Sequence, residues 1–179
     1  DEDAGRHHAR ALPRRLPGQY NFRMTPSPIS LVSLAHAADL PRLFDVWHLS
    51  VRATHDFLAD SDIAFLSPYV HDELARVSAE GLLHVLRDAD GSACAFLCVE
   101  HARIEMLFVH PDRRGSGAGR ALVQHALAAL GATAVDVNEH NTQAHGFYRH
   151  LGFIVESRSP LDPFGKPFPI LHLKLAENA

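Results

Sequence analysis

The sequence has little of what marks secreted, membrane-bound or nucleic-acid-binding proteins. It contains only two cysteines among 179 residues, which argues against a disulfide framework. No run of about 18 apolar residues occurs, which argues against a membrane-spanning helix. The formal net charge is −4, so there is no basic excess to attract nucleic acid. With 46% hydrophobic residues, the chain is long enough for one domain around a single core.

The two cysteines, Cys94 and Cys98, stand within an apolar run. If that run is a strand, side chains four residues apart point to the same face of the sheet. We interpret them as buried thiols that pack as small hydrophobic groups in a reducing compartment, and a metal pair or a redox switch is the alternative. The cytoplasm is therefore the expected location.

The first 28 residues differ in composition from the rest of the chain. They carry four of the eleven prolines and five arginines, and they show no apolar period. The arginine-rich part, from Arg6 to Arg23, has too little serine for an organelle-targeting peptide, and no apolar stretch there suits a secretory signal. We therefore expect residues 1–28 to be a tail and residues 29–179 to form one domain.

From residue 29 onward, the spacing of apolar residues alternates between a period of two and a period of about 3.6, which is typical of strands and helices. Asp39 is the expected N-cap of the first helix, and Asp90-Gly91 predicts a hairpin turn. Strands are expected at 29–34, 82–87, 92–101, 103–109, 133–138, 153–159 and 168–175, and helices at 39–55, 60–79, 117–130 and 142–151. This order indicates an α/β chain with a mixed, mostly antiparallel central sheet and helices on both faces.

The stretch RGSGAG, residues 114–119, lies between an expected strand and an expected helix. Glycines leave backbone N–H groups uncovered, and the first helical turn adds unpaired donors and the positive end of the helix dipole. Such a turn binds phosphate. A nucleotide-triphosphate loop would need Gly-Lys-Ser/Thr, whereas Arg120 and Ala121 follow here, and the dinucleotide fingerprint spaces its glycines differently. A turn that only caps the helix is the alternative.

Two further segments accompany this loop. The strand MLFVHP precedes RRGSGAG, and NEHNTQAHGFYRHLGF follows downstream. Together they resemble the signature of the GNAT superfamily of N-acetyltransferases, which pairs Arg/Gln-x-x-Gly-x-Gly/Ala with a later Asn…Ala…Phe-Tyr…Gly-Phe. Arg114, Gly117 and Gly119 stand at the signature positions. The resemblance covers about residues 29–175, and the segments SVRATHDFL and FGKPFPILHL resemble a bacterial branch of the superfamily.

This resemblance implies the GNAT fold and an enzyme that uses acetyl-CoA as co-substrate, without a metal. The acetyl group would pass to a primary amine, in a small molecule or a protein, by direct attack in a ternary complex. A domain that binds acyl-CoA as a sensor or partner module, without turnover, is the alternative from a different class. The protein is expected to be a monomer or a homodimer.

The resemblance also implies which residues bind acetyl-CoA. The pyrophosphate would lie on the backbone amides of the glycine loop, and the pantetheine arm would pair with the strand before it, as an added strand does. Asn141 resembles a residue that holds the pantetheine arm, although it is equally expected as a helix N-cap. The implied set is Leu107, Phe108, Val109, Arg114, Gly115, Ser116, Gly117, Ala118, Gly119, Arg120, Asn141 and Tyr148.

Attack of an amine on a thioester needs a route for the amine proton and an acid for the departing thiolate. Tyr148 resembles the family's general acid, with a purely structural aromatic as the alternative. The backbone N–H near Val109 would polarise the thioester carbonyl. Candidate bases are Glu105, Asp136, Glu139 and histidines such as His110, with Asp136 favoured because some relatives carry an acid on that strand; transfer through water is the alternative.

Histidine is abundant, with 14 residues, but its spacing does not predict a metal site. His140, His145 and His150 are five residues apart, which turns them away from one another on a helix. We interpret most of the histidines as surface residues.

The acceptor is expected between the first two helices and the turn before the last strand, by resemblance. The lining candidates are Arg52, Thr54, His55, Asp56 and Phe57. The sequence leaves open whether the amine belongs to a protein, an amino acid, a polyamine or an antibiotic.

Overall fold

The computed structural model describes residues 32–176, so the predicted tail and the first residues of the strand expected at 29–34 lie outside the described residues. The strands are β1 (Ser33–Leu34), β2 (Leu83–Arg87), β3 (Ala93–Glu100), β4 (Arg103–Val109), β5 (Ala134–Asn138), β6 (Phe153–Ser159) and β7 (Ile170–Leu175). The helices are α1 (Leu40–Thr54), α2 (Asp60–Ala79), α3 (Ala118–Ala129) and α4 (Thr142–His150), with short 3-10 turns η1 (Ala37–Asp39) and η2 (Pro111–Arg113). Apart from β1, every predicted element begins and ends within two residues of the observed one.

The strands form one seven-stranded sheet in the order β1-β2-β3-β4-β5-β7-β6. The predicted hairpin joins β2 to β3, and β4 continues the antiparallel meander. β4 and β5 pair in parallel, whereas the other neighbouring strands pair antiparallel. The sheet is thus mixed and mostly antiparallel, as the sequence predicts.

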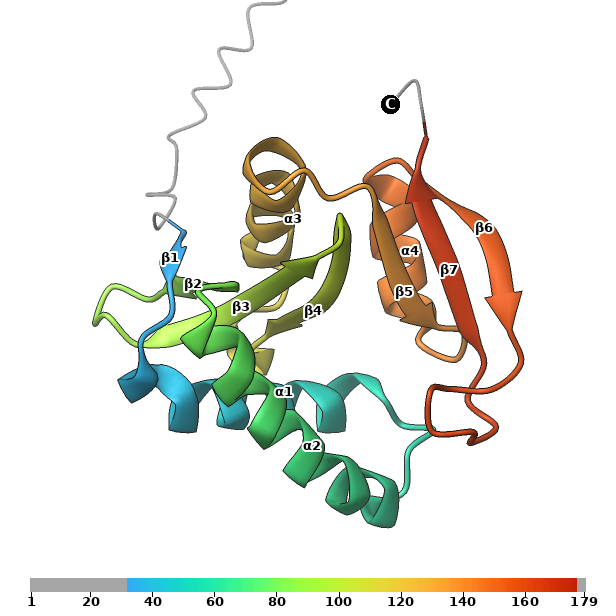
Figure 1. Cartoon of the computed structure of the whole chain (residues 1–179), viewed down its shortest axis with the longest axis horizontal. Helices are drawn as coiled ribbons and strands as arrows, with labels where there is room; N and C mark the ends of the chain where they lie inside the picture. Colours follow the sequence, from blue (N-terminus) through green and yellow to red (C-terminus); the bar gives the residue numbers. More distant parts are fainter. Residues whose placement is uncertain (1–31, 177–179) are drawn as a thin grey trace, which may run out of the picture.

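Helices cover both faces of the sheet, and each face has its own apolar cluster. The cluster between α1, α2 and the meander includes Trp47, Leu74 and Phe96. The cluster on the opposite face joins α3 and α4 to the sheet and includes Leu122 and Phe153. In Figure 1, α1 and α2 lie beneath the half of the sheet that contains β2, β3 and β4.

The sheet opens at its centre, between β4 and β5. These strands pair at Arg103 with Ala134 and at Ile104 with Val135, and the pairing ends there. Figure 1 shows the two strands diverging toward the end of the sheet near α1. Leu107 to Val109 pair with β3 on one side only, so the backbone groups on the other side have no strand partner. This opening positions the site described below.

The expectation that Cys94 and Cys98 share a face is wrong. Arg87 pairs with Ala93 and Leu86 with Ala95, so Cys94 is an extra residue in a β-bulge. The bulge changes the alternation, and Cys94 joins the α3–α4 cluster whereas Cys98 joins the α1–α2 cluster. Both thiols are free and buried, and burial raises the pKa of Cys94 to about 11 and that of Cys98 to about 12. They pack as small hydrophobic groups on opposite sides of the sheet.

Asp39 precedes α1, but it does not cap the helix with its side chain. Its carboxylate accepts hydrogen bonds from Arg87 at 2.7 and 2.8 Å and from the backbone N–H of His36 at 2.8 Å. The Arg87 guanidinium holds the pKa of Asp39 at about 2. This ion pair ties the start of α1 to the sheet.

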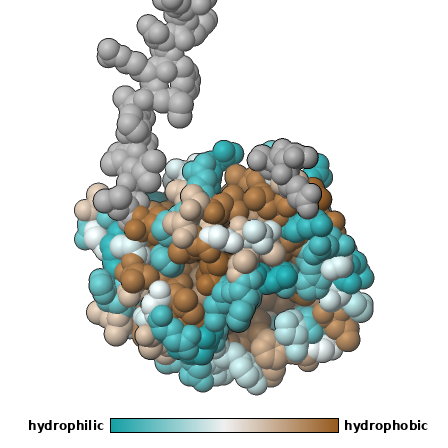
Figure 2. Space-filling model, turned by 45° about the horizontal axis from the view of Figure 1, so that its top comes forward, coloured by the Kyte–Doolittle hydropathy of each residue, from teal (hydrophilic) through white to brown (hydrophobic). Residues whose placement is uncertain are grey.

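No helix within residues 32–176 combines the length and the apolar character needed to cross a membrane. Figure 2 shows apolar and polar side chains interspersed over the face that it presents.

Candidate active site

The glycine loop, residues 114–119, connects η2 to α3 at the open end of β4. Gly115 and Gly117 have φ values of 75° and 92°, in the left-handed region that favours glycine. Gly117 is the N-cap residue of α3, and a Cβ built on it would meet no atom within 4 Å. Its lack of a side chain therefore serves the backbone conformation and leaves the space before the helix free.

Gly119 serves a different purpose, in the first turn of α3. A Cβ there would lie 3.4 Å from Cζ of Phe147 and 3.7 Å from a methyl carbon of Val109. The small residue lets α3 begin close to both β4 and α4. As a result, the unpaired N–H groups of its first turn lie at the gap between the diverging strands.

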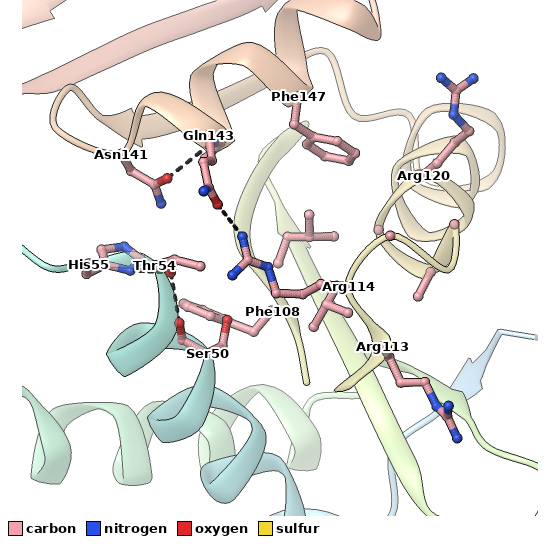
Figure 3. A pocket seen from close by; sticks show the side chains of 17 residues that line it. Ser50, Thr54, His55, Phe108, Arg113, Arg114, Arg120, Asn141, Gln143 and Phe147 are labelled. Atoms are coloured by element: carbon pink, nitrogen blue, oxygen red, sulfur yellow. Dashed lines mark hydrogen bonds between the residues drawn. The ribbon is translucent and has the colours of Figure 1, made fainter. Parts of the chain in front are cut away.

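A cavity of about 420 Å³, called here the loop cavity, lies at the open end of β4. Its walls come from the end of β4, the glycine loop with the start of α3, the first half of α4 and the end of α1, as Figure 3 shows. Its lining includes most of the residues predicted to bind acetyl-CoA, namely Leu107, Phe108, Val109, Arg114, Gly115, Gly117, Ala118, Gly119, Arg120 and Asn141. Ser116 and Tyr148 are not among the lining residues. The Ser116 hydroxyl instead donates to the backbone oxygen of Arg113 at 2.7 Å.

The three arginines near the loop are held differently. Arg113 donates to Asp88 at 2.7 Å. Arg114 donates to the side-chain oxygen of Gln143 and lies across the middle of the loop cavity in Figure 3. Arg120 lines the same cavity from α3 and has no ion pair within residues 32–176. Arg114 and Arg120 thus bring positive charge to the loop cavity near the start of α3, where the backbone N–H groups of the first turn are free.

Asn141 is the N-cap of α4, as the sequence predicts. Its side-chain oxygen accepts from the backbone N–H of Ala144 at 3.0 Å. The side chain is 9% exposed and lines the loop cavity. Capping uses the amide oxygen, so the amide nitrogen can still serve a ligand.

Tyr148 lies in the core, where its ring packs edge-on against Phe147 and Phe153 at centroid distances of 5.1 and 5.6 Å. It lines a smaller space of about 120 Å³, called here the inner cavity, which shares Asn141 and Leu107 with the loop cavity. Burial raises the pKa of Tyr148 well above its usual value of 10. The phenol therefore stays protonated at neutral pH.

The predicted bases lie in unequal environments. Asp136 lines the inner cavity, but its carboxylate pairs with Arg103 and accepts from His172 at 2.8 Å. Glu139 is paired with Arg158 at 2.6 Å. Glu105 lines the inner cavity, has no ion pair within the described residues, and has its pKa raised by burial.

His110 is the N-cap of η2. Its ring nitrogen Nδ1 accepts from the backbone N–H of Asp112 at 3.3 Å. It lines none of the cavities described here.

A space of about 220 Å³, called here the aromatic cavity, lies between α1, α2 and the turn before β7. Trp47, Phe57 and Phe168 are among its walls. Lys166 also lines it, and the Lys166 ammonium lies 2.6 Å from a carboxylate oxygen of Asp62. This is the region where the sequence predicts the acceptor.

The predicted acceptor residues are only partly brought together. His55 and Phe57 line the aromatic cavity, whereas Thr54 lines the loop cavity. Arg52 lines none of the described cavities and instead pairs with Asp60 at 3.0 Å on the surface. The nearby Asp56 is exposed.

Two side chains are shared by all of these cavities. His55 and Phe108 line the loop cavity, the inner cavity and the aromatic cavity. Phe108 is on β4, and His55 is the C-cap residue that follows α1. The cavities therefore meet where the open strand faces the end of α1.

Sequence reasoning missed several lining residues. Ser50, Gln143 and Phe147 line the loop cavity, and the Asp62–Lys166 pair lines the aromatic cavity. Gln143 stands two residues after Asn141, and Phe147 belongs to the Gly-Phe-Tyr segment. Their places in the motif were the available signals that these residues could line the site. Nothing local in the sequence marks Ser50, because it lines the site through the packing of α1.

Comparison with known proteins agrees with this geometry. Residues 79–155 match the acetyltransferase (GNAT) domain family. The peptidyl-lysine N-acetyltransferase YjaB of Salmonella typhimurium is 41% identical over 132 residues, which are 74% of this chain and 88% of that protein.

Solved structures show the same fold. The solution structure of apo-form YjaB from Escherichia coli has a TM-score of 0.71 at 34% identity, covering 82% of this chain and 97% of that chain. The PaiA N-acetyltransferase of Thermoplasma acidophilum, crystallised in complex with coenzyme A, has a TM-score of 0.62 at 18% identity, covering 82% of this chain and 98% of that chain. The family expected from the glycine loop is confirmed: the chain belongs to the GNAT family of acetyl-CoA-dependent N-acetyltransferases.

Proposed function

We propose that this acetyltransferase moves the acetyl group of acetyl-CoA to the side-chain amine of a lysine within a protein, by direct attack in a ternary complex. One observation carries the proposal: the loop cavity and the aromatic cavity are lined by different segments of the chain but share His55 and Phe108. A donor in one cavity and an acceptor in the other would place thioester and amine at that junction.

The loop cavity suits acetyl-CoA. The free amides at the start of α3, with Arg120 beside them, fit the pyrophosphate. The unpaired edge of β4 from Leu107 to Val109 fits the amides of the pantetheine arm, and Asn141 would bind the same arm through its amide nitrogen. The thioester would then lie between the β4 edge and the end of α1.

The aromatic cavity suits the methylene chain of a lysine. Its walls at Phe57 and Phe168 are apolar, and an apolar setting lowers the pKa of an amine, which favours the neutral form that attacks. The YjaB relatives are named as peptidyl-lysine N-acetyltransferases, which supports the same acceptor class.

Exposed aromatic side chains at the mouth of this cavity support a protein acceptor over a small one. Phe164 lines the cavity and is 45% exposed, and its ring packs against Phe65 and Tyr69 at centroid distances of 5.4 and 5.1 Å. An exposed aromatic group beside a binding cavity fits residues that flank the lysine in a peptide.

For the chemistry we propose Tyr148 as the acid that protonates the departing thiolate, and the backbone N–H near Val109 as the donor to the thioester oxygen. Asp136 is the less suitable base, because Arg103 and His172 already use its carboxylate. Nδ1 of His110 accepts the hydrogen bond from Asp112 that caps η2, and His110 would have to lose this bond to accept a proton there. The two buried thiols fit a reducing compartment, which supports a cytoplasmic location.

An acceptor screen tests the proposal. The full chain is incubated with acetyl-CoA and one of three acceptors: an N-terminally blocked lysine peptide, the same peptide with arginine in place of lysine, or small amines such as polyamines and amino acids. Of the three acceptors, we expect only the lysine peptide to cause thiol release from acetyl-CoA. Mass spectrometry should place the acetyl group on its lysine. Release with small amines only would contradict the acceptor class, and binding of acetyl-CoA without release would favour the non-catalytic alternative.

A further inference from the structure

We propose that His55 is the general base of the transfer, and that Thr54 holds its imidazole in the tautomer that leaves Nε2 free to take a proton from the acceptor amine. This proposal rests on the proposed transfer to an amine. It assigns to His55 a catalytic role and to Thr54 a positioning role.

The tautomer follows from two hydrogen bonds at the end of α1. The hydroxyl of Thr54 donates to the backbone oxygen of Ser50, with an oxygen–oxygen distance of 2.8 Å. The same hydroxyl oxygen lies 2.7 Å from Nδ1 of His55. A hydroxyl has one hydrogen, and a backbone oxygen can only accept, so we assign that hydrogen to the Ser50 contact and infer that the hydroxyl oxygen accepts from His55. Nδ1 therefore carries the hydrogen, and in the neutral ring Nε2 holds the lone pair.

The position of His55 is suited to proton transfer. It is half-buried at the C-cap of α1, and it lines the loop cavity, the inner cavity and the aromatic cavity. Figure 3 shows its ring beside Thr54 at the wall of the loop cavity. On its other side, the His55 ring contacts Phe57 at a centroid distance of 5.3 Å. An amine reaching the junction from the aromatic cavity thus passes the imidazole before it meets the thioester.

The charge state of His55 is also suitable. Burial lowers the pKa of His55 below its usual value of 6.5, against smaller opposite effects from the Val51 backbone and the charge of Asp56. The ring is therefore neutral and able to accept a proton at pH 7. The charged and titratable groups that line the same cavities, or stack beyond Phe57, are Arg113, Arg114, Arg120, Glu105, Asp136, Tyr148, Asp62, Asp162, Lys166 and His140.

The protons balance as follows. The acceptor arrives as an ammonium with three N–H bonds, and Nε2 of His55 takes one proton. The neutral nitrogen attacks the thioester carbon, forming a C–N bond, and the C–S bond then breaks with the electron pair leaving on sulfur. The thiolate takes a second proton, from Tyr148 in the proposed mechanism, and the adduct nitrogen returns one to the tyrosine. The third hydrogen stays on the amide, and His55 releases its proton to water.

The tautomer can be measured without any acceptor. Nitrogen-15 NMR of the full chain with labelled histidine, assigned with the His55→Gln variant, distinguishes a protonated ring nitrogen from an unprotonated one. We expect Nδ1–H and an unprotonated Nε2 at pH 7, and a titration midpoint below 6.5. A ring with the hydrogen on Nε2 would overturn the proposal.

Kinetics with the lysine peptide test the catalytic role. His55→Gln should lower kcat about 10²-fold or more, the range of general base catalysis, and should remove the acid limb of the pH profile. Affinity for acetyl-CoA should stay within about threefold, less than about 0.7 kcal/mol. His71→Gln, an exposed histidine away from these cavities, is the matched control and should keep the wild-type profile.

Thr54 variants test the positioning role. Thr54→Val should lower kcat about tenfold by removing the acceptor for Nδ1–H, whereas Thr54→Ser, which keeps the hydroxyl, should stay close to wild type.

A His55→Gln variant that keeps full kcat and the acid limb of the pH profile would overturn the proposal. Loss of that limb in Glu105→Gln would assign the base to Glu105. A wild type that turns over no acceptor would contradict the proposed function, while the NMR result would still decide the tautomer.

Discussion

At the scale of single residues, Tyr148 is a core position for which we propose a role in the chemistry. The residue is 5% exposed, its ring packs against Phe153, and burial keeps its hydroxyl protonated. Tyr148→Phe keeps the ring and removes the proton, so kcat should fall about 10²-fold, as expected for loss of a general acid. Single-turnover rates on the lysine peptide measure the effect.

A structural role for Tyr148 would give the opposite result. In that case the Tyr148→Phe variant would have a lower thermal midpoint of unfolding than the wild type, and its kcat per folded molecule would stay unchanged. Ser92→Ala, in the turn between β2 and β3 and outside the described cavities, is the control for the loss of one hydroxyl.

Phe57 and Arg52 are neighbours in sequence but should differ in function. Phe57 lines the aromatic cavity, whereas Arg52 forms a surface ion pair with Asp60. Phe57→Ala should raise the peptide KM about tenfold by removing an aromatic wall, with acetyl-CoA affinity unchanged. Arg52→Ala should change the peptide KM less than about threefold, in line with the small value of an exposed ion pair. A larger effect at Arg52 than at Phe57 would contradict the assignment of the aromatic cavity to the acceptor.

At the scale of elements, we propose that the glycine loop and α3 act together as the phosphate site. Gly117→Asp would strain a residue with φ of 92° and place a negative charge before the helix. Acetyl-CoA affinity should fall at least about tenfold, or roughly 1.4 kcal/mol, by isothermal titration calorimetry.

Backbone strain alone must be separated from loss of the phosphate site. Gly131, just beyond α3, also has a positive φ of 66° and open space around it, but it lines none of the described cavities. Gly131→Asp should therefore lower stability without lowering acetyl-CoA affinity. Equal affinity in folded Gly117→Asp and wild-type protein would contradict the phosphate assignment.

The bounds of elements were predictable where a turn residue marks an end. α2, β4 and β6 have the predicted bounds, because Gly81 follows α2, Pro111 follows β4 and Gly152 precedes β6. The bulge at Cys94 was not predictable, because it depends on how β3 pairs with β2 and β4. That single extra residue reversed the expected face of one cysteine.

At the scale of the whole molecule, the site is assembled from distant segments. The glycine loop and Asn141 were identified from a motif, whereas Ser50 and the Asp62–Lys166 pair became visible only through the packing of α1, α2 and the turn before β7. Local sequence indicates which residues can bind phosphate. It does not indicate how two cavities meet, because that depends on where β4 and β5 stop pairing.

The central claim is that donor and acceptor occupy these two cavities at the same time and react directly. Initial velocities measured over a grid of acetyl-CoA and lysine-peptide concentrations test it most directly, with intact-mass spectrometry of the protein during turnover. We predict reciprocal plots that intersect, an acetylated lysine in the product and no acetylated form of the protein. Parallel plots together with an acetylated protein intermediate would show transfer in two separate steps and would contradict the claim.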